Sequence, residues 1–486
     1  MLERYGSLDR RLADEQQTFA RSLRSLVQRA AVTCEASRTL AEVAALMRSQ
    51  GVGSVVVVDA QGRPLGIVTS HDMVRVAAEE GGGRPVAEIM SSDPVSLPAH
   101  ALAYEAAVAM TARHIRHILV MDEGRLIGVV SERDLFSLQR LGLGEITMEL
   151  RLAGDLKVLS ALASEIRKLT LRLVEKGVGP EQLMLFVSVL NDRLSQRVIE
   201  IVRKRHDLER ISWCWLAFGS EGRLEQTLAT DQDNGLIFAA HEGIDPSQVR
   251  ARLLGFAREV NEALDASGFP LCKGNVMASN PALCLSAEEW RAKMSSWIEV
   301  SMPKALLDAA ICFDFRALYG DASLVASLRE WVSARVKAQP AFLRHMAEAA
   351  LQARPALNRM GGFATKDVKG APGSINLKLQ GARIFVDAAR IYALAQGVTQ
   401  TNTADRLRSV RGALGMNEAD AAAAVEAFFL VQRLRLRNQV MQREGDPEAA
   451  NRVAPDQLNR IEQAGLKEAL RTAKDLQSRL ALDYQL

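Results

Sequence analysis

The amino-acid sequence predicts a multidomain protein of the α+β class, and three observations support this prediction. The chain has 486 residues, which is too long for a single hydrophobic core and suggests about three domains. A helix–strand–strand–helix pattern occurs twice in the N-terminal third, around Gly66 and around Gly128. Short apolar strands flank residues 219–234 in the middle of the chain, whereas the pattern from Leu324 onward is helical almost throughout.

The composition is that of an ordinary globular protein. Hydrophobic residues make up 48% of the chain, and Ala, Leu and Arg dominate, a mixture that favours helices. The net charge of +3 is small for this length, so we expect neither nucleic acid nor a membrane surface as a partner.

The cysteines and the N-terminus indicate a cytoplasmic protein. The five cysteines are scattered without C-x-x-C spacing and mostly lie in apolar runs, so we expect reduced, buried thiols. The N-terminus is charged and lacks the apolar region of a signal peptide. No stretch approaches the ~20 apolar residues that a membrane-spanning helix needs.

The N-terminal third contains a strong internal repeat, which we place within residues 26–140, after a helical segment at residues 1–25. The string Gly66-Ile-Val-Thr-Ser-His-Asp-Met73 recurs as Gly128-Val-Val-Ser-Glu-Arg-Asp-Leu135. Each copy follows an apolar strand that ends in Asp and a glycine turn, and each strand follows a helical pattern. The sequence therefore predicts two equal helix–strand–strand–helix units.

This repeat resembles a tandem pair of cystathionine-beta-synthase (CBS) domains, also called a Bateman module. In that family a Thr or Ser hydroxyl contacts phosphate, and an Asp accepts hydrogen bonds from the ribose of a bound adenine nucleotide. The resemblance implies that Thr69 with Asp72, and Ser131 with Asp134, bind a regulatory adenine nucleotide. It also implies a homodimer formed through the CBS domains. The open alternative is that each Asp caps the following helix, because [ST]-x-x-[DE] is also a helix-start pattern.

Residues 141–206 are predicted to form an antiparallel helical hairpin. Apolar residues fall at helical spacing over residues 145–175 and 180–205, and a Gly-Val-Gly-Pro break at residues 177–180 separates the two runs. Such a hairpin would transmit the state of the repeated units to the next domain, or act only as a spacer.

Residues 213–238 are predicted to form a strand, a tight turn, a helix and a second strand. Residues 213–218 are apolar and aromatic, as in a strand buried on both faces, and this run stops at Gly219-Ser220. Residues 221–228 have helical composition, so the turn would lie at a helix N-terminus. Free backbone N–H groups at such a position bind phosphate well.

Two acidic residues, Asp231 and Asp233, precede the second apolar strand at residues 236–238. Side chains at positions i and i+2 of a strand point to the same face, so we expect the two carboxylates to project together. Paired carboxylates suit magnesium, which prefers one or two of them together with substrate phosphates. The alternative is an ordinary surface loop, because an Asp-x-Asp pair after a Gly-Ser turn is not specific by itself.

The Gly219-Ser220 turn, followed by Asp231-x-Asp233, resembles the signature of the polymerase-beta-type nucleotidyltransferase superfamily. The fuller string resembles the nucleotidyltransferase domain related to bacterial protein-PII uridylyltransferases, which we place at residues 207–325. This resemblance implies transfer of a nucleoside monophosphate from a nucleoside triphosphate, ATP or UTP, with Mg²⁺ or Mn²⁺. The implied metal ligands are Asp231 and Asp233, which form the catalytic group together with Ser220. The implied triphosphate ligands are Gly219, Ser220, Arg223 and Thr230.

The sequence departs from the superfamily at the third carboxylate, which many members place on a neighbouring strand. Residues 269–279 are expected to return to the sheet, but they contain no Asp or Glu, and Asn275 is a neutral, weaker ligand. A two-carboxylate site, a distant third ligand and an inactive enzyme are all open. Asp314 is the candidate for a distant metal ligand, and the alternative is a structural contact between Asp314 and Arg316.

Residues 326–486 are predicted to form a helical domain. A Gly- and Lys-rich interruption at residues 361–378 either faces an active site and holds triphosphate or acceptor, or connects two helices. The next segment, Lys378-x-x-Gly-x-Arg383, is similar to one in the helical domain of uridylyl- and adenylyltransferases that act on nitrogen-regulation proteins, which implies a substrate-binding domain. Three arginines alternate along a later helix, as on a solvated face: Arg433, Arg435 and Arg437.

These observations favour a cytoplasmic, CBS-regulated nucleotidyltransferase that acts in signal transduction. The acceptor would be a protein, such as a small nitrogen-regulation protein, or a small molecule. The alternative is a catalytically inactive protein that senses adenine nucleotides and serves in regulation or docking, which the missing third carboxylate favours. Addition of nucleotides to nucleic acid is disfavoured, because neither a basic stripe nor aromatic stacking positions are apparent in the sequence.

Overall fold

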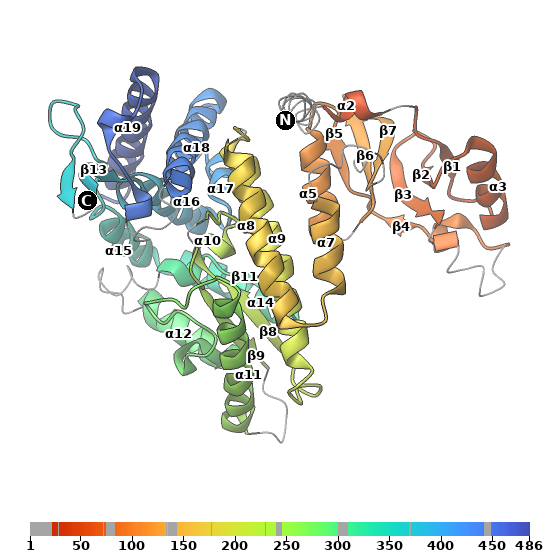
Figure 1. Ribbon diagram of the computed structural model, residues 1–486, viewed down its shortest axis with the longest axis horizontal. Helices are drawn as coiled ribbons and strands as arrows, with labels where there is room; N and C mark the ends of the chain where they lie inside the picture. The colour runs from red at the N-terminus through yellow and green to blue at the C-terminus, as the bar shows by residue number, and fades with distance from the viewer. Residues whose placement is uncertain are drawn as a thin grey trace, which may run out of the picture. The chain divides into compact units, whose positions relative to one another are not determined.

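The computed structural model divides into two units, an N-terminal unit over Met1–Thr147 and a C-terminal unit over Met148–Leu486 (Figure 1). The structure describes residues 22–27, 29–70, 72–73, 83–113, 115–132, 134, 143–175, 177–228, 230–239, 245–299, 310–368, 371–441 and 449–486. Both units contain strands and helices, so the predicted multidomain α+β class is confirmed. Most of the helical segment predicted over residues 1–25 lies outside the described residues.

The N-terminal unit contains the two predicted repeats, each built around an antiparallel strand pair. Its elements are α2 (Leu23–Leu26), β1 (Thr33–Glu35), α3 (Leu40–Gln50), β2 (Ser54–Val58), β3 (Pro64–Thr69), η1 (Val86–Glu88), β4 (Ser91–Ser92), β5 (Ser96–Pro98), α5 (Ala103–Arg113), β6 (His117–Asp122) and β7 (Arg125–Ser131). In the first repeat Val55 lies opposite Val68, and in the second Ile118 lies opposite Val130. All four side chains are fully buried, because the apolar face of each strand pair forms the core of its repeat.

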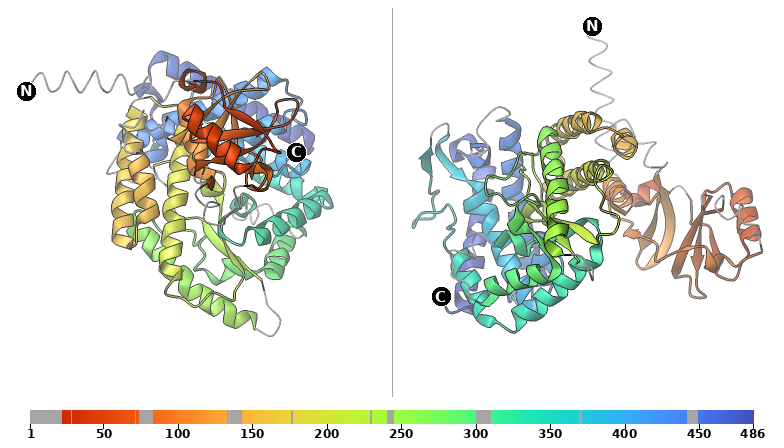
Figure 2. Two further views of the ribbon diagram at one scale, coloured as in Figure 1. Left: turned by 90° about the vertical axis from the view of Figure 1, so that its right-hand side faces the viewer. Right: turned by 90° about the horizontal axis from the view of Figure 1, so that it is seen from below.

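The C-terminal unit is larger and consists mainly of helices around a four-stranded sheet (Figure 2). Its helices are α7 (Leu143–Leu152, which begins in the N-terminal unit), α8 (Leu156–Glu175), α9 (Pro180–Arg203), α10 (Gly219–Gly222), α11 (Pro246–Ala266), α12 (Ala287–Glu299), α14 (Ala322–Lys337), α15 (Pro340–Ala350), α16 (Arg383–Gln396), α17 (Thr403–Ser409), α18 (Glu418–Met441) and α19 (Arg460–Asp483). Its strands are β8 (Trp213–Ala217), β9 (Asn234–Phe238), β10 (Cys284–Ser286), β11 (Arg316–Gly320), β12 (Lys366–Val368), β13 (Ala371–Asn376) and β14 (Arg452–Val453). Its short turns are η2 (Pro281–Leu283), η3 (Ala310–Phe313), the π-helical η4 (Lys378–Ala382), η5 (Ala449–Asn451) and η6 (Pro455–Gln457).

The four-stranded sheet has the order β10-β9-β8-β11. β8 runs antiparallel to both β9 and β11, whereas β9 runs parallel to β10. Every residue of β8 and β9 is buried, as predicted for strands covered on both faces. Two sequence expectations fail beside this sheet: residues 269–279 do not form a strand, and the helix expected over residues 221–228 is only the single turn α10.

The predicted helical hairpin is present as α8 and α9, with Gly177 at a φ of 76° in the break and Pro180 at the start of α9, but the first predicted run, residues 145–175, is divided into α7 and α8 by residues 153–155. α9 packs against α8, and also against α11, α18 and β11. Fourteen of its side chains are therefore buried, so α9 is a core helix of the C-terminal unit rather than an exposed connection.

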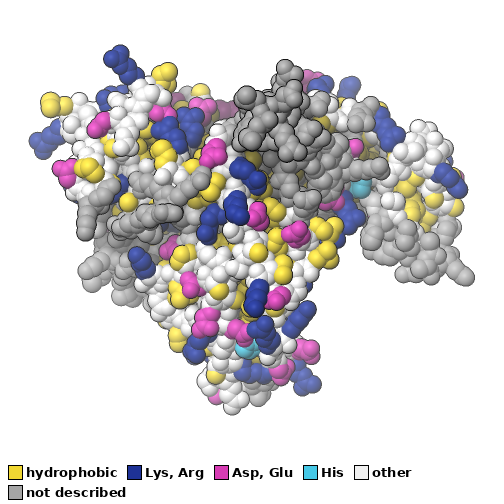
Figure 3. Space-filling view, in the orientation of Figure 1, with side chains coloured by type: hydrophobic (Ala, Val, Ile, Leu, Met, Phe, Trp, Pro, Cys, Tyr) yellow, Lys and Arg dark blue, Asp and Glu magenta, His cyan; other side chains and the backbone are white. Residues whose placement is uncertain are grey.

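One continuous hydrophobic core extends from the sheet into the C-terminal helices. It includes Cys214 and Leu216 of β8, Trp290 of α12, Phe385 of α16 and Phe428 of α18. The sheet and the helices after it are therefore packed as one body. On the face shown in Figure 3, acidic and basic side chains are interspersed over this unit.

The C-terminal helical region departs from the sequence predictions at two places. Part of the Gly- and Lys-rich interruption forms the β12–β13 hairpin, and Lys369 and Gly370 at its tip lie outside the described residues. The arginines of α18 do not form one solvated face, because Arg435 is buried and donates to Asn451 at 2.8 Å and to Gln432 at 2.5 Å. Within the described residues, no helix is long and apolar enough to cross a membrane.

Candidate functional site

The turn after β8 is shaped by two glycines that leave no room for a side chain. Gly219 has a φ of 54°, and a Cβ there would lie 2.8 Å from a neighbouring isoleucine and 3.1 Å from Oδ2 of Asp233. At Gly222, a Cβ would lie 2.0 Å from the carbonyl oxygen of Asp314. The start of the predicted phosphate turn therefore lies directly against the Asp233 carboxylate.

Asp231 and Asp233 immediately precede β9, and the residue between them points elsewhere. The buried side-chain amide of Gln232 donates to the carbonyl oxygens of Asn261 and Phe269, at 2.9 and 2.8 Å. Asp231 is exposed, whereas Asp233 is 8% exposed. This alternation leaves the two carboxylates together at the end of the sheet, with one open to solvent and one buried.

The two carboxylates fit a divalent cation. Burial raises the pKa of Asp233 to about 7, and the negative charge of Asp231 contributes to that rise. The charges of Lys378, at the start of η4, and of Arg223 act in the opposite direction, so both cations lie near Asp233. A bound divalent ion would offset the burial and the repulsion that favour a proton on Asp233.

A third side chain, which the search for carboxylates missed, lies beside this pair. One ligand atom from each of Asp231, Asp233 and Cys272 lies within 4.8 Å of the other two. The Cys272 thiol donates to Oδ1 of Asp233 at 3.4 Å. It reaches this position because residues 269–279 pass the first residue of β9, Asn234, whose backbone N–H donates to the carbonyl oxygen of Val276 at 3.1 Å.

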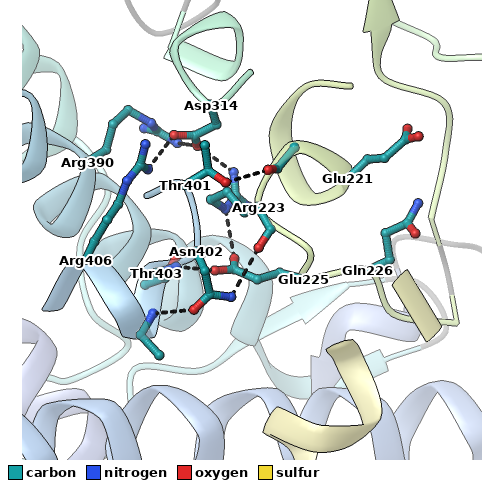
Figure 4. Close-up of polar contacts among 12 residues, drawn as sticks. Glu221, Arg223, Glu225, Gln226, Asp314, Arg390, Thr401, Asn402, Thr403 and Arg406 are labelled. Atoms are coloured by element: carbon teal, nitrogen blue, oxygen red, sulfur yellow. Dashed lines mark hydrogen bonds and ion pairs between the residues drawn. The ribbon is translucent and has the colours of Figure 1, made fainter. Parts of the chain in front are cut away.

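Asp314 does not join the carboxylate pair, contrary to its prediction as a distant metal ligand. Its side chain is fully buried and accepts hydrogen bonds from Arg223 at 2.7 Å, Arg390 at 2.6 Å and Arg406 at 2.5 Å (Figure 4). Burial opposes ionisation, but the guanidinium groups of Arg390, Arg406 and Arg223 hold the pKa of Asp314 well below its usual range. With three cations on its two oxygens, this carboxylate has a structural role.

Arg316, the partner that the sequence suggested for Asp314, pairs elsewhere. Its guanidinium donates to Asp192 of α9 at 2.7 Å and to the carbonyl oxygen of Glu221. The Glu221 side chain points away from the arginine cluster in Figure 4 and is buried. Burial raises the pKa of Glu221 to about 8, with a further contribution from the charge of Asp192.

Hydrogen bonds from residues at the start of α17 fix the positions of Arg223 and its neighbours. The Arg223 guanidinium donates to Glu225 at 2.8 Å as well as to Asp314, so it is engaged in ion pairs rather than held ready for phosphate. Glu225 accepts from the backbone N–H of Thr403 at 2.6 Å, and the Thr401 hydroxyl donates to the Gly222 carbonyl oxygen at 2.7 Å (Figure 4). Residues 222–225 are therefore fixed by a segment almost two hundred positions later in the chain.

Thr230, another predicted triphosphate ligand, closes a local turn. Its hydroxyl donates to the carbonyl oxygen of Thr227 at 2.9 Å and accepts from the Thr227 backbone N–H at 3.1 Å. These two bonds shape the chain just before Asp231.

The four predicted nucleotide ligands of the N-terminal unit form two equivalent pairs. Asp72 accepts from the backbone N–H and the hydroxyl of Thr69, at 2.9 and 2.7 Å. Asp134 does the same with Ser131, at 2.8 and 2.5 Å, and its own N–H donates back to the Ser131 hydroxyl. This is the helix-capping arrangement that the sequence left open. Burial lowers the pKa of His117, and the charges of Asp134 and Asp72 act in the opposite direction.

Comparison with known proteins identifies the N-terminal unit. A model of the CBS domain matches residues 23–79 and 86–140. The CBS domain-containing protein YhcV of Bacillus subtilis is 32% identical over 105 residues, which cover 21% of this chain and 74% of that protein. This chain belongs to the CBS domain-containing proteins.

Further proteins are similar to about a quarter of this CBS domain-containing protein. The protein MK0525 of Methanopyrus kandleri is 28% identical over 134 residues, covering 27% of this chain and 68% of that protein. The solved CBS domain protein PAE2072 of Pyrobaculum aerophilum, complexed with AMP, is 29% identical and covers 26% of this chain and 97% of its own, with a TM-score of 0.24. The CBS-domain protein ATU1752 of Agrobacterium tumefaciens is 28% identical, covers 25% and 96% of the two chains, and also has a TM-score of 0.24.

Two further family models match the C-terminal unit of this CBS domain-containing protein. Residues 164–304 match the family described as "Putative nucleotidyltransferase DUF294", and residues 340–484 match the "Putative nucleotidyltransferase substrate binding domain". The first range contains the turn and the carboxylate pair, and the second contains Arg390, Arg406 and residues 401–403. Asp314 lies between the two ranges and joins them through its three arginines.

Proposed function

We propose that the C-terminal unit transfers a nucleoside monophosphate from ATP or UTP to a protein side chain or a small molecule. The observation that carries this proposal is the meeting of the Asp231 and Asp233 carboxylates beside the Gly219-Ser220 turn. The match of residues 164–304 to a nucleotidyltransferase family supports the reaction class. A relationship to the protein-PII uridylyltransferases, and hence a small nitrogen-regulation protein as acceptor, rests on the motif at residues 219–234 and is part of the proposal.

Each group near the carboxylates would have a separate task. Asp231 and Asp233 would hold Mg²⁺ or Mn²⁺, which when bound neutralises charge on the leaving pyrophosphate. The backbone N–H groups of the turn and the Ser220 hydroxyl would bind the triphosphate. Lys378, whose charge acts on Asp233, would add a cation for the same phosphates.

Arg223 would contribute indirectly to this reaction. Its ion pairs with Asp314 and Glu225 hold the turn on the C-terminal helices, so it positions the phosphate-binding residues instead of contacting phosphate itself.

The CBS pair would regulate the transfer by binding an adenine nucleotide. The candidate ligands are Thr69, Asp72, Ser131 and Asp134, whose paired geometry is the same in both repeats. We further propose that the CBS pair joins two copies of the chain, which light scattering on the purified protein would test.

Transfer of radiolabelled nucleotide tests the catalytic proposal. We expect the native protein to label its acceptor with divalent metal present, and Asp231→Asn and Asp233→Asn to reduce labelling at least a hundredfold. Asp475→Asn, the same change at an exposed position of α19, is the matched control and should label normally. Equal labelling by all four proteins would refute the assignment of the carboxylates.

The non-catalytic alternative makes a different prediction for nucleotide binding. If the C-terminal unit only senses or docks nucleotide, calorimetry will detect ATP or UTP binding that is unchanged by metal and by both Asp substitutions. A requirement of binding for metal and for Asp233 would support the transferase.

A further inference from the structure

Cys272 differs from the other cysteines of the chain in its exposure and its neighbours. Cys34, Cys214, Cys284 and Cys312 are all buried, whereas Cys272 is partly exposed. It stands in residues 269–279, which contain no carboxylate, and its sulfur lies within 4.8 Å of a carboxylate oxygen of Asp231 and of Asp233.

The spacing of the three ligand atoms suits a single ion. Two ligands of one ion are separated by at most about twice the metal–ligand distance, which is ~4.6 Å for a Zn–S bond of ~2.3 Å. The ligand atoms of Asp231, Asp233 and Cys272 all lie within 4.8 Å of one another, and the Cys272 sulfur lies 3.4 Å from Oδ1 of Asp233.

Burial and the charges of Asp233 and Asp231 raise the pKa of the Cys272 thiol, and the backbone around it opposes that rise. Residues 272–275 form a turn in which Asn275 N donates to the Cys272 carbonyl oxygen at 2.9 Å, with Asn275 in the left-handed region at a φ of 54°. The backbone N–H groups of Val276 and Gly274 are directed at the sulfur. Donors to sulfur favour the thiolate over the thiol and orient it, as groups behind a metal ligand do.

Asp233 supplies an independent indication that a cation belongs at this place. Its carboxylate is more than nine-tenths buried, and within the described part of the chain the hydrogen bond that it accepts comes from the Cys272 thiol. A thiol is a weak donor, so it compensates little of the free energy lost when a carboxylate leaves water. A metal ion in contact with both groups would compensate that loss far better.

We propose that Cys272 is the third protein ligand of the metal held by Asp231 and Asp233, and that this two-oxygen, one-sulfur set selects a divalent transition metal of the Mn²⁺ to Zn²⁺ series over Mg²⁺. The inference rests on the proposed function and specifies its metal. Oxygen ligands alone accept Mg²⁺ readily, but thiolate sulfur favours softer ions. When the metal–sulfur bond forms, the thiol proton is released to solvent, and a proton held by Asp233 is released as well when its carboxylate binds the ion.

Alkylation of the native full-length protein tests the metal contact without any need for turnover. The protein is stripped with a chelator, treated with iodoacetamide, and the rate of Cys272 modification is followed by mass spectrometry of its peptide. We expect saturating Zn²⁺ or Cd²⁺ to slow the reaction at least tenfold, Mn²⁺ to slow it measurably, and Mg²⁺ to leave the rate within twofold. The four buried cysteines are internal controls for unfolding.

Two variants assign the protection to this site. Asp231→Asn retains the thiol but removes the exposed carboxylate, and it should abolish most of the protection by Zn²⁺ and Cd²⁺. Cys272→Ser should abolish the ultraviolet charge-transfer band that a cadmium–thiolate bond gives in the native protein. Equal alkylation rates with and without each metal, or protection that survives in Asp231→Asn, would overturn the proposal.

Failure of this inference can be separated from failure of the proposed function. If Zn²⁺ or Cd²⁺ protects Cys272 but no metal supports nucleotide transfer, Cys272 is a metal ligand and the proposed transferase activity is refuted. If Mg²⁺ supports transfer and no metal protects Cys272, the transferase activity is supported and Cys272 is not a metal ligand. Cys272→Asp, which restores a third carboxylate, should shift the metal preference of binding towards Mg²⁺ by at least tenfold.

Discussion

At the scale of single residues, the C-terminal unit contains a buried arginine cluster around Asp314. One buried carboxylate faces the guanidinium groups of Arg223, Arg390 and Arg406, and Glu225 and Asp387 share in balancing those charges. A buried ion pair contributes little net stability while it is complete, but removal of one partner leaves uncompensated buried charge. The cluster is therefore most sensitive at its single central anion.

Asp314→Asn should destabilise the protein by about 3–5 kcal/mol, because three guanidinium groups then lose their shared counterion. Urea unfolding at pH 7 measures the change, with Asp475→Asn as the exposed control, for which we expect a change within about 0.5 kcal/mol. A loss below about 1 kcal/mol would mean that the arginines relax to solvent. Because the pKa of Asp314 is lowered, its stabilisation is present above the unfolded value and is lost as the pH falls through the folded value.

The contribution of Glu221 to stability should change with pH in the opposite direction to that of Asp314. Its pKa is raised to about 8, mainly by burial, so its contribution to stability is fully present below the unfolded value and is lost as the pH rises through 8. Glu221→Gln removes this dependence, and the variant should gain about 2 kcal/mol relative to the native protein between pH 6 and pH 8. Denaturant unfolding at several pH values measures the difference. Parallel stability curves for the two proteins would show that Glu221 is ionised at neutral pH.

At the scale of elements, the single turn α10 is fixed from both sides. Gly222 touches the backbone of Asp314, and the start of α17 holds residues 222–225 through Thr401 and Thr403. The turn that carries the predicted phosphate-binding groups thus depends on Asp314, between the two matched ranges, and on the start of α17, within the second range.

Gly222→Ala should destabilise the C-terminal unit by about 3 kcal/mol or more, since the new Cβ would meet the Asp314 carbonyl oxygen at 2.0 Å. Gly255→Ala is the matched control: Gly255 lies in α11 with no atom within 4 Å of a Cβ, and alanine there should stabilise by about 0.5–1 kcal/mol. Thermal unfolding of both variants makes the comparison. Similar midpoints for the two would show that η3 and β11 move apart to admit the methyl group.

The elements that the sequence predicted are those whose signals are local. The strands on either side of residues 219–234 are predicted by apolar runs. The placement of the Asp231 and Asp233 side chains on one side of the chain is predicted by the alternation of side chains along a strand. Both signals involve neighbouring positions only. The partners of Asp314 lie 76, 91 and 92 positions away, and no periodicity within a segment shows which distant cation will reach it. Arg435 was predicted to be solvated for the same reason, because its acceptor Asn451 belongs to another segment.

At the scale of the whole molecule, the two units have separate cores and should unfold as separate transitions. The N-terminal cores contain residues before position 131, whereas the large core begins at Cys214. A ligand stabilises only the unit that binds it, by about 2.7 kcal/mol at a concentration one hundred times its dissociation constant.

Scanning calorimetry with AMP should therefore raise one of two transitions and leave the other within experimental error. Asp72→Asn combined with Asp134→Asn should remove that shift, because the double variant loses both carboxylates proposed to accept from ribose. UTP with Mn²⁺ should raise only the other transition. A shift of both transitions by AMP alone would place a second adenine-nucleotide site in the C-terminal unit.

The continuous core that joins the sheet to the C-terminal helices restricts how such a chain can be recombined. A fusion that replaces the CBS pair with another sensor needs a single joint, placed before α7 so that this helix, within which the two units divide, stays intact. A cut between the two matched ranges would instead open the shared core and separate Asp314 from Arg390 and Arg406. We therefore expect residues 148–486 to be exchanged between proteins as one unit, although two family models match different parts of it.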